Sequence, residues 1–230
     1  MRLAIMAAAL AAGATVVCST SGTAWADPEP KADRAIEVGF RTGYVPLPLG
    51  DVVGGANGNP SLSLGDEISG VLPLWFEAGY RFNHNMMIGG FLQYGIAFVN
   101  TGKQTECTMG SNSCGANDVM FGAQFHYHII PDGPIDPWVG AGIGYESLNY
   151  SYTILGQNVS GSYSGFQFLN LQGGADYKVM ANLGVGPFLM LSFGEYGNCS
   201  SNQGSCPLPA TALHEWLTIG VRGVYDISLL

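Results

Sequence analysis

The chain has 230 residues, of which 47% are hydrophobic, 11% aromatic and only 11% charged, whereas charged residues make up about 25% of an ordinary soluble domain. Its formal net charge of −9 excludes nucleic acid as the main partner, because binding to phosphates needs clustered Lys and Arg. The apolar content excludes simple disorder, and beyond the N-terminus no run of about 18 apolar residues predicts a membrane-spanning helix.

The first 26 residues have the layout of a secretory signal peptide. Arg2 gives a positive start, residues 3–18 are almost wholly apolar, and Ala24-Trp25-Ala26 has the small-x-small pattern that signal peptidase reads. We expect cleavage after this tripeptide rather than lipidation at Cys18, because a branched residue precedes Cys18 where a lipoprotein signal has a small one. Residues 27–230 are then predicted to form one barrel domain.

Alternation of apolar and polar residues with a period of two recurs through this mature chain and predicts eight β-strands. In the run 139–146, for example, the odd-numbered residues are apolar and the even-numbered ones are Gly or Glu. The predicted strands lie at 36–44, 74–82, 88–98, 118–129, 139–146, 169–177, 184–193 and 216–227. Long loops are predicted near 45–71, 100–117, 148–164 and 195–212, and short turns near 83–85, 131–137 and 178–182.

Long loops at one end and short turns at the other are the layout of an outer-membrane barrel. Tilted strands of about ten residues span its apolar band of roughly 25 Å. The alternative is a soluble barrel with its polar face in water, but such a surface would be rich in Lys and Glu. All three lysines lie outside the predicted strands: Lys31, Lys103 and Lys178. We therefore predict an all-β, eight-stranded antiparallel up-and-down transmembrane β-barrel with its apolar face toward lipid.

The run Pro137-Trp138-Val139-Gly140-Ala141-Gly142-Ile143-Gly144-Tyr145 resembles the aromatic and Gly-x-Gly-x-Gly strand of small eight-stranded outer-membrane proteins of the outer membrane protein A, X and W type. The resemblance covers the mature chain in layout. It implies an outer-membrane location, contact with outer-membrane lipid and lipopolysaccharide, and insertion by the barrel-assembly machinery. Two features depart from the family. The chain ends in Leu229-Leu230 rather than in an aromatic residue, and Pro187 falls on the lipid side of a strand, where we expect a bulge or an altered register.

Four cysteines remain after the signal peptide: Cys107, Cys114, Cys199 and Cys206. Export implies an oxidising compartment, in which disulfides are the default. Four cysteines allow three pairings, and we favour 107–114 and 199–206 because each closes one short loop. A zinc site is the less favoured interpretation, because paired C-x-x-C motifs are absent.

Six charged residues on the inward-facing side of the strands predict a charge network inside the barrel. In an antiparallel first hairpin, residue 37 opposite 81 and residue 41 opposite 77 belong to one register. We therefore hypothesise two ion pairs, Glu37–Arg81 and Arg41–Glu77, with Arg222 and Asp226 of the last strand joining them. The alternative is that these charges contact water and one another loosely.

Other inward-facing residues have less specific interpretations. His126 and His128 lie two apart on one strand face and, together with Asp118, would suit a metal ion, but histidines that hydrogen-bond inside a polar lumen are commoner. A lipid-modifying barrel enzyme would need a Ser beside a His, and no His-x-Ser pair falls on a predicted strand. We therefore predict no enzymatic activity, no cofactor and no metal site. Three tryptophans also face inward, as plugs or at the rim: Trp75, Trp138 and Trp216.

An eight-stranded barrel is just wide enough for its own side chains to fill. The sequence therefore predicts a non-enzymatic outer-membrane barrel with an envelope-structural or surface-interaction role through its long loops. The two loops that carry the disulfides are where we expect binding of an extracellular ligand. A narrow channel for small or hydrophobic solutes and a soluble periplasmic ligand-binding barrel remain as alternatives.

Overall fold

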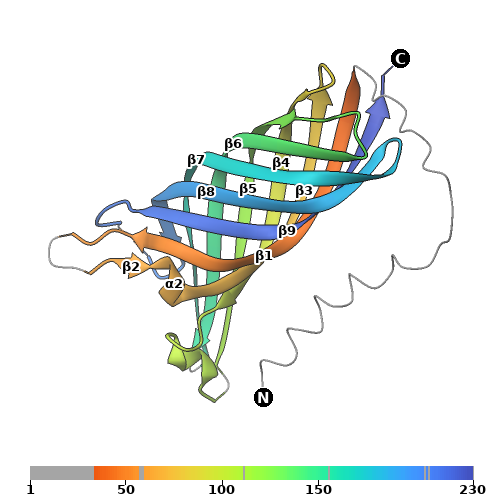
Figure 1. The fold of residues 1–230 in the computed structure, drawn as a ribbon. Helices are drawn as coiled ribbons and strands as arrows, with labels where there is room; N and C mark the ends of the chain where they lie inside the picture. The colour runs from red at the N-terminus through yellow and green to blue at the C-terminus, as the bar shows by residue number, and fades with distance from the viewer. Residues whose placement is uncertain are drawn as a thin grey trace.

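The computed structural model describes residues 34–56, 60–110, 112–154, 156–204, 206 and 208–229, so the predicted signal peptide at 1–26 lies outside the described residues. Within this part of the chain no helix is long and apolar enough to cross a membrane. The elements follow in the order β1 (Ala35–Val53), β2 (Leu62–Ser63), α2 (Leu64–Glu67), β3 (Ile68–Arg81), β4 (Met86–Val99), η1 (Thr105–Thr108), β5 (Ser113–His128), β6 (Ile135–Ile154), β7 (Gln157–Met180), β8 (Leu183–Ser201) and β9 (Leu213–Ser228) (Figure 1).

Eight of these strands close into a barrel, as the alternation predicts. Each long strand pairs antiparallel with the next long strand along the chain, and β9 pairs back onto β1 from Ala35–Ser228 to Gly50–His214. The two-residue β2 pairs only with the far end of β1. Within the closed part of the barrel, each long strand of the described chain therefore has a neighbour on both sides, which is the condition for placing a sheet in hydrocarbon.

The barrel has two different ends. The short connections at 82–85, 129–134 and 181–182 lie at one end, which we call the turn end. There the Leu229 N–H donates a hydrogen bond to the Arg34 carbonyl (3.0 Å), so the two ends of the described chain meet. The opposite end, which we call the loop end, carries β2, α2, η1 and the far parts of the long hairpins. Figure 1 shows the strands of these hairpins running on past the closed barrel.

The strands are longer than predicted. Of the four predicted long loops, those near 100–117 and 195–212 remain as connections at 100–112 and 202–212, and the one near 45–71 is shortened at both ends. The loop predicted at 148–164 is wrong, because β6 and β7 run through this stretch and leave only residues 155–156 between them. Lys178, which the sequence places in a turn, lies near the end of β7. The extensions at the loop end are rich in Ser, Asn, Tyr and Gly, so they show no apolar–polar alternation although the backbone ladder continues.

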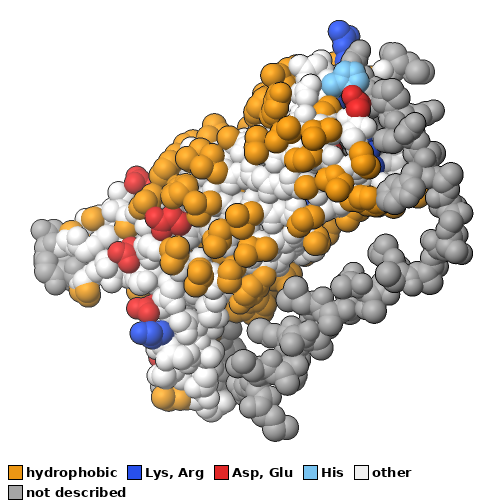
Figure 2. Space-filling view, viewed as in Figure 1, with side chains coloured by type: hydrophobic (Ala, Val, Ile, Leu, Met, Phe, Trp, Pro, Cys, Tyr) orange, Lys and Arg blue, Asp and Glu red, His pale blue; other side chains and the backbone are white. Residues whose placement is uncertain are grey.

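The outer face of the barrel is apolar, as predicted. Outward side chains such as Phe76, Ile88, Val139, Ile143 and Ile219 are each 50–56% exposed. Figure 2 shows hydrophobic side chains spread across the middle of the visible face, with acidic and basic side chains near its two ends. This distribution matches the apolar band of a barrel that faces lipid.

Pro187 lies on the outer face of β8, and neither the expected bulge nor an altered register is found there. The register of β8 with β9 is unbroken. The ladder with β7 is interrupted between the pairs Gly174–Phe188 and Tyr177–Val185, which share one register. The missing Pro N–H is therefore accommodated by a local gap in one ladder.

We expect Ile143→Arg to lower the free energy of unfolding by about 2–4 kcal/mol, because this side chain lies in the outer apolar belt and a charge at the bilayer midplane is costly. The matched variant, Asn198→Arg, changes an exposed residue of β8 at the loop end and should cost at most about 1 kcal/mol. Urea unfolding in phospholipid vesicles measures both. Equal, small losses would mean that the belt does not face lipid.

Candidate functional site

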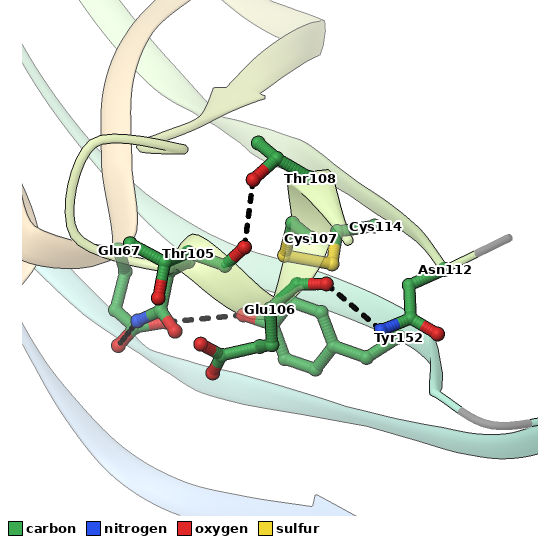
Figure 3. The surroundings of a disulfide bond; sticks show 9 residues. Glu67, Thr105, Glu106, Cys107, Thr108, Asn112, Cys114 and Tyr152 are labelled. Carbon is green, nitrogen blue, oxygen red and sulfur yellow. Dashed lines mark hydrogen bonds between the residues drawn. A yellow bond between two sulfur atoms is a disulfide. The ribbon is translucent and has the colours of Figure 1, made fainter. Parts of the chain in front are cut away.

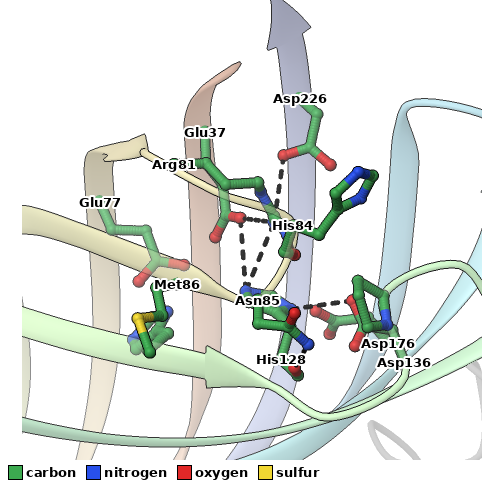
Figure 4. A network of polar contacts seen from close by, with 12 residues as sticks. Glu37, Glu77, Arg81, His84, Asn85, Met86, His128, Asp136, Asp176 and Asp226 are labelled. Carbon is green, nitrogen blue, oxygen red and sulfur yellow. Dashed lines mark hydrogen bonds and ion pairs between the residues drawn. The ribbon is translucent and has the colours of Figure 1, made fainter. Parts of the chain in front are cut away.

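The lumen near the turn end is filled by ion-paired side chains from β1, β3, β5, β6 and β9. The Arg81 guanidinium is fully buried and contacts the Glu37 carboxylate, and its Nη2 lies 3.4 Å from Asp226 Oδ1. His128 Nδ1 lies 2.8 Å from Asp136 Oδ2. Figure 4 shows these groups pointing toward one another across the barrel. Charged groups from strands far apart in the sequence therefore contact one another at one level of the lumen.

Arg222 links this level to the middle of the barrel. Its Nε donates to Glu77 Oε1 (2.8 Å), its Nη1 donates to Asp176 Oδ2 (2.5 Å), and its Nη2 contacts Glu37. Arg41 contacts the same Glu77. The Cζ atoms of Arg41 and Arg222 lie 5.1 and 4.7 Å from the ring of Trp138. A planar guanidinium can bind carboxylates along its edge and stack on an aromatic face at the same time.

The structure brings together all six residues of the predicted network, but the predicted strand register is wrong by two residues. Glu77 lies opposite Gly39, not opposite Arg41. The pairs Arg41–Glu77 and Glu37–Arg81 form along diagonals, which long side chains on neighbouring strands can reach. A Cβ on Gly39 would lie 2.5 Å from Glu77 Oε1, so this glycine leaves the space that the carboxylate occupies.

The two predicted lumen histidines join this network. One ligand atom each of Glu37, His126 and His128 lies within 4.8 Å of the others, which is close enough for a shared metal ion. Arg41 Nη2, however, lies 3.2 Å from His126 Nε2, and a fixed positive charge there opposes a cation. Asp118 does not belong to this group of possible ligands. It lies nearer the loop end, where its Oδ2 accepts a hydrogen bond from Gln93 Nε2 (2.8 Å).

A second buried cluster, centred on Glu146, was not predicted. Its carboxylate accepts hydrogen bonds from Trp216 Nε1 (2.9 Å), Gln167 Nε2 (3.2 Å) and the Tyr196 hydroxyl, and His214 Nε2 lies 3.2 Å away. These partners come from β7, β8 and β9. The sequence does hold one indication of this cluster: the alternation along the strands places Glu146 and His214 on the inward face, as it does the residues of the first network.

An apolar cap closes the lumen at the loop end. Leu64 of α2 and Val52 at the end of β1 have no exposed surface, so the connection between β1 and β3 folds into the mouth. Beneath the cap, a cavity of about 10 Å³ beside Asp118 and Trp216 holds at most one water molecule. The buried members of the cap are Val45, Val52, Val53, Leu64, Ile68, Val71, Ala97, Leu148, Tyr196 and Trp216.

The three inward-facing tryptophans act as plugs and do not form a rim. Trp75, Trp138 and Trp216 are at most 3% exposed. Trp75 stacks on Phe91 with ring centroids 4.2 Å apart. The lumen is therefore packed from the charge network through aromatic side chains to the cap.

Both predicted disulfides, Cys107–Cys114 and Cys199–Cys206, are present at the loop end, with Cα atoms 5.5 and 5.4 Å apart. Beside the first (Figure 3), the Glu67 carboxylate accepts hydrogen bonds from Gln104 Nε2 (2.7 Å) and the Tyr152 hydroxyl (3.0 Å). One carboxylate thus joins α2, the connection between β4 and β5, and the loop-end part of β6.

We expect the coupling free energy between Glu37 and Arg81 to be about 1–3 kcal/mol in a double-mutant cycle with Glu37→Gln and Arg81→Met. Each single variant should cost more, about 3–5 kcal/mol, because it leaves a buried charge unpaired. The control cycle uses His84 and Asp132, a partly exposed pair 3.7 Å apart, whose coupling should not exceed about 1 kcal/mol. No coupling between Glu37 and Arg81 would mean that the two groups do not meet.

Burial raises the pKa of the Glu67 carboxyl above its usual value. The folded chain therefore holds this proton more tightly than the unfolded chain, and stability of the loop end increases as pH falls toward the usual carboxyl range. The Asn100 N–H donates to the Glu67 carbonyl (2.8 Å). Its hydrogen-exchange protection factor should rise between about pH 7 and pH 5 in the wild type but not in Glu67→Gln. A rise of the same size in Glu67→Gln would exclude Glu67 as the cause.

Comparisons with known proteins show the fold and no closer relationship. No protein-family model and no curated protein matches the chain. Among solved structures, the outer membrane protein AlkL in lipid bilayers is 13% identical, with a TM-score of 0.51 over 91% of this chain and 98% of that chain. OprG from Pseudomonas aeruginosa is 10% identical, with a TM-score of 0.49 over 86% and 99% of the two chains. Neisserial surface protein A is 14% identical, with a TM-score of 0.41 over 82% and 94%. The chain therefore has the fold of the small eight-stranded outer-membrane β-barrel proteins.

Proposed function

We propose that this protein resides in the outer membrane and acts there without catalysis, as an interaction protein that presents its loop end outside the cell. The observation that carries the proposal is the filled lumen. An eight-stranded barrel is only wide enough for its own side chains. In the described part of this chain, two polar clusters and an apolar cap occupy the interior, and the cavity beside Asp118 and Trp216 has a volume of only about 10 Å³.

The same packing argues against the channel interpretation. A solute entering from the loop end would first have to displace Leu64 and Val52. It would then meet the Glu146 cluster and, further on, the guanidinium of Arg222, which contacts three carboxylates. Removing such buried groups from their partners costs several kcal/mol each, so this path is closed at equilibrium.

The loop end, in contrast, has the properties of a preformed binding surface. Strand extensions rather than free loops build most of it. Two disulfides and the Glu67 hydrogen bonds hold its connections in place. Binding to such a surface loses little conformational entropy, because most of the ordering occurs on folding.

We expect the protein, inserted into planar lipid bilayers, to show no discrete conductance steps. Insertion of a closed barrel is verified on the same preparation by a shift in gel mobility between unboiled and boiled samples. Fractionation of cells should place the full-length protein in the outer membrane. Reproducible single-channel steps from verified barrels would overturn the proposal in favour of a channel, and a soluble periplasmic protein without a gel shift would favour a ligand-binding barrel.

A further inference from the structure

A groove of about 690 Å³ lies at the loop end, across the strand extensions of β4 to β8. Every residue that lines it is uncharged. This is unexpected for a chain with 17 acidic residues. The polar and aromatic lining includes Tyr94, Asn117, Asn149, Ser162, Ser200 and Asn202.

The chemistry of this lining fits sugar rings. Amide and hydroxyl side chains both donate and accept hydrogen bonds, as sugar hydroxyls do. Tyr94, 48% exposed at the edge of the groove, adds a flat apolar surface with a polar tip. Without a basic side chain the groove offers nothing to neutralise phosphate or sulfate, so charge complementarity favours an uncharged ligand.

The polar walls are held in place before any ligand binds. Asn149 Nδ2 donates to Asn117 Oδ1 (3.0 Å) across two strands. Asn202 Oδ1 accepts a hydrogen bond from the Ser160 N–H (2.9 Å). Ser200 and Asn202 lie within the segment that the Cys199–Cys206 disulfide closes. This wall is therefore preorganised, which lowers the entropic cost of binding.

The groove begins where the apolar belt ends. Tyr94 and Ile96 line it, and both are also exposed on the outer face of β4 among the belt residues. A lipid whose acyl chains lie against the belt would place its headgroup at this level. We propose that the groove binds uncharged sugar units of an oligosaccharide, and that its source is a glycolipid of the outer leaflet. This inference rests on the proposed outer-membrane location.

The test uses the mature protein in nanodiscs of phosphatidylcholine. Wild-type protein is titrated with lipopolysaccharide that carries a hexose-containing core and with lipopolysaccharide truncated before the first hexose. Free maltoheptaose and chitotetraose are titrated separately. We expect the hexose-bearing lipopolysaccharide to bind at least about tenfold more tightly than the truncated form.

Gly115→Trp should abolish this preference, because Gly115 lines the groove and a Cβ at this position would meet no other atom within 4 Å, so the indole can extend into the groove. Gly197→Trp is the matched control. Gly197 also faces open space on β8 but does not line the groove, and its variant should bind like the wild type. The gel-mobility shift of both variants checks that the barrel is closed.

Tighter binding of the hexose-bearing lipopolysaccharide than of either free sugar would support the glycolipid source. Equal affinity for a free oligosaccharide would keep the sugar site and overturn the glycolipid source. Equal affinity for both lipopolysaccharides, with no binding of either free sugar, would overturn the inference, as would wild-type binding by Gly115→Trp. A non-conducting outer-membrane barrel without sugar affinity would refute only this inference, whereas a conducting barrel that retains it would refute only the proposed function.

Discussion

Hydrocarbon offers no hydrogen-bond partner to a peptide group or a charged side chain, so a sheet placed in it must close on itself and turn its polar side chains inward. The rest of this structure depends on that constraint. β9 returns to β1 and completes the backbone ladder. Charged side chains that would be solvated on a soluble protein are then confined to a space just wide enough for side chains to fill, in which they must pair with one another.

Arginine side chains stabilise the carboxylates that are confined in the lumen. Arg222 contacts three carboxylates and also stacks on Trp138, and Arg41 and Arg81 serve the neighbouring acids. The geometry also needs glycine, as at Gly39, where a side chain would displace Glu77. Side chains that contact one another in this way fill the described part of the lumen. We infer that the requirement to pair these charges also fills the barrel, which supports the loop end as the surface for function.

Much of this fold could be predicted, because residues facing lipid and lumen alternate at a fixed period and mark strands wherever the barrel meets the membrane. The same alternation places Glu37, Arg41, Glu77 and Arg81 on the inward face, where they form ion pairs. These pairs are diagonal, so a register that sets the partners directly opposite one another is wrong by two residues. Beyond the membrane the constraint ends. Ser, Asn and Tyr then occupy both faces, so the sequence pattern predicts a loop where β6 and β7 extend. The Glu146 cluster could not be predicted, because its members lie on four different strands. Which of their residues lie at the same level of the lumen depends on how the strands are shifted along one another, and the sequence does not show that shift.

If the polar and aromatic side chains of the lumen face away from lipid, tryptophan fluorescence in vesicles of brominated phospholipid should show it. After cleavage of the predicted signal peptide the chain has three tryptophans, all buried in the lumen: Trp75, Trp138 and Trp216. We expect weak quenching of their emission and strong quenching of a tryptophan added by Ile143→Trp on the outer face. Strong quenching of the wild type, with no further quenching in the variant, would contradict the assignment of the two faces.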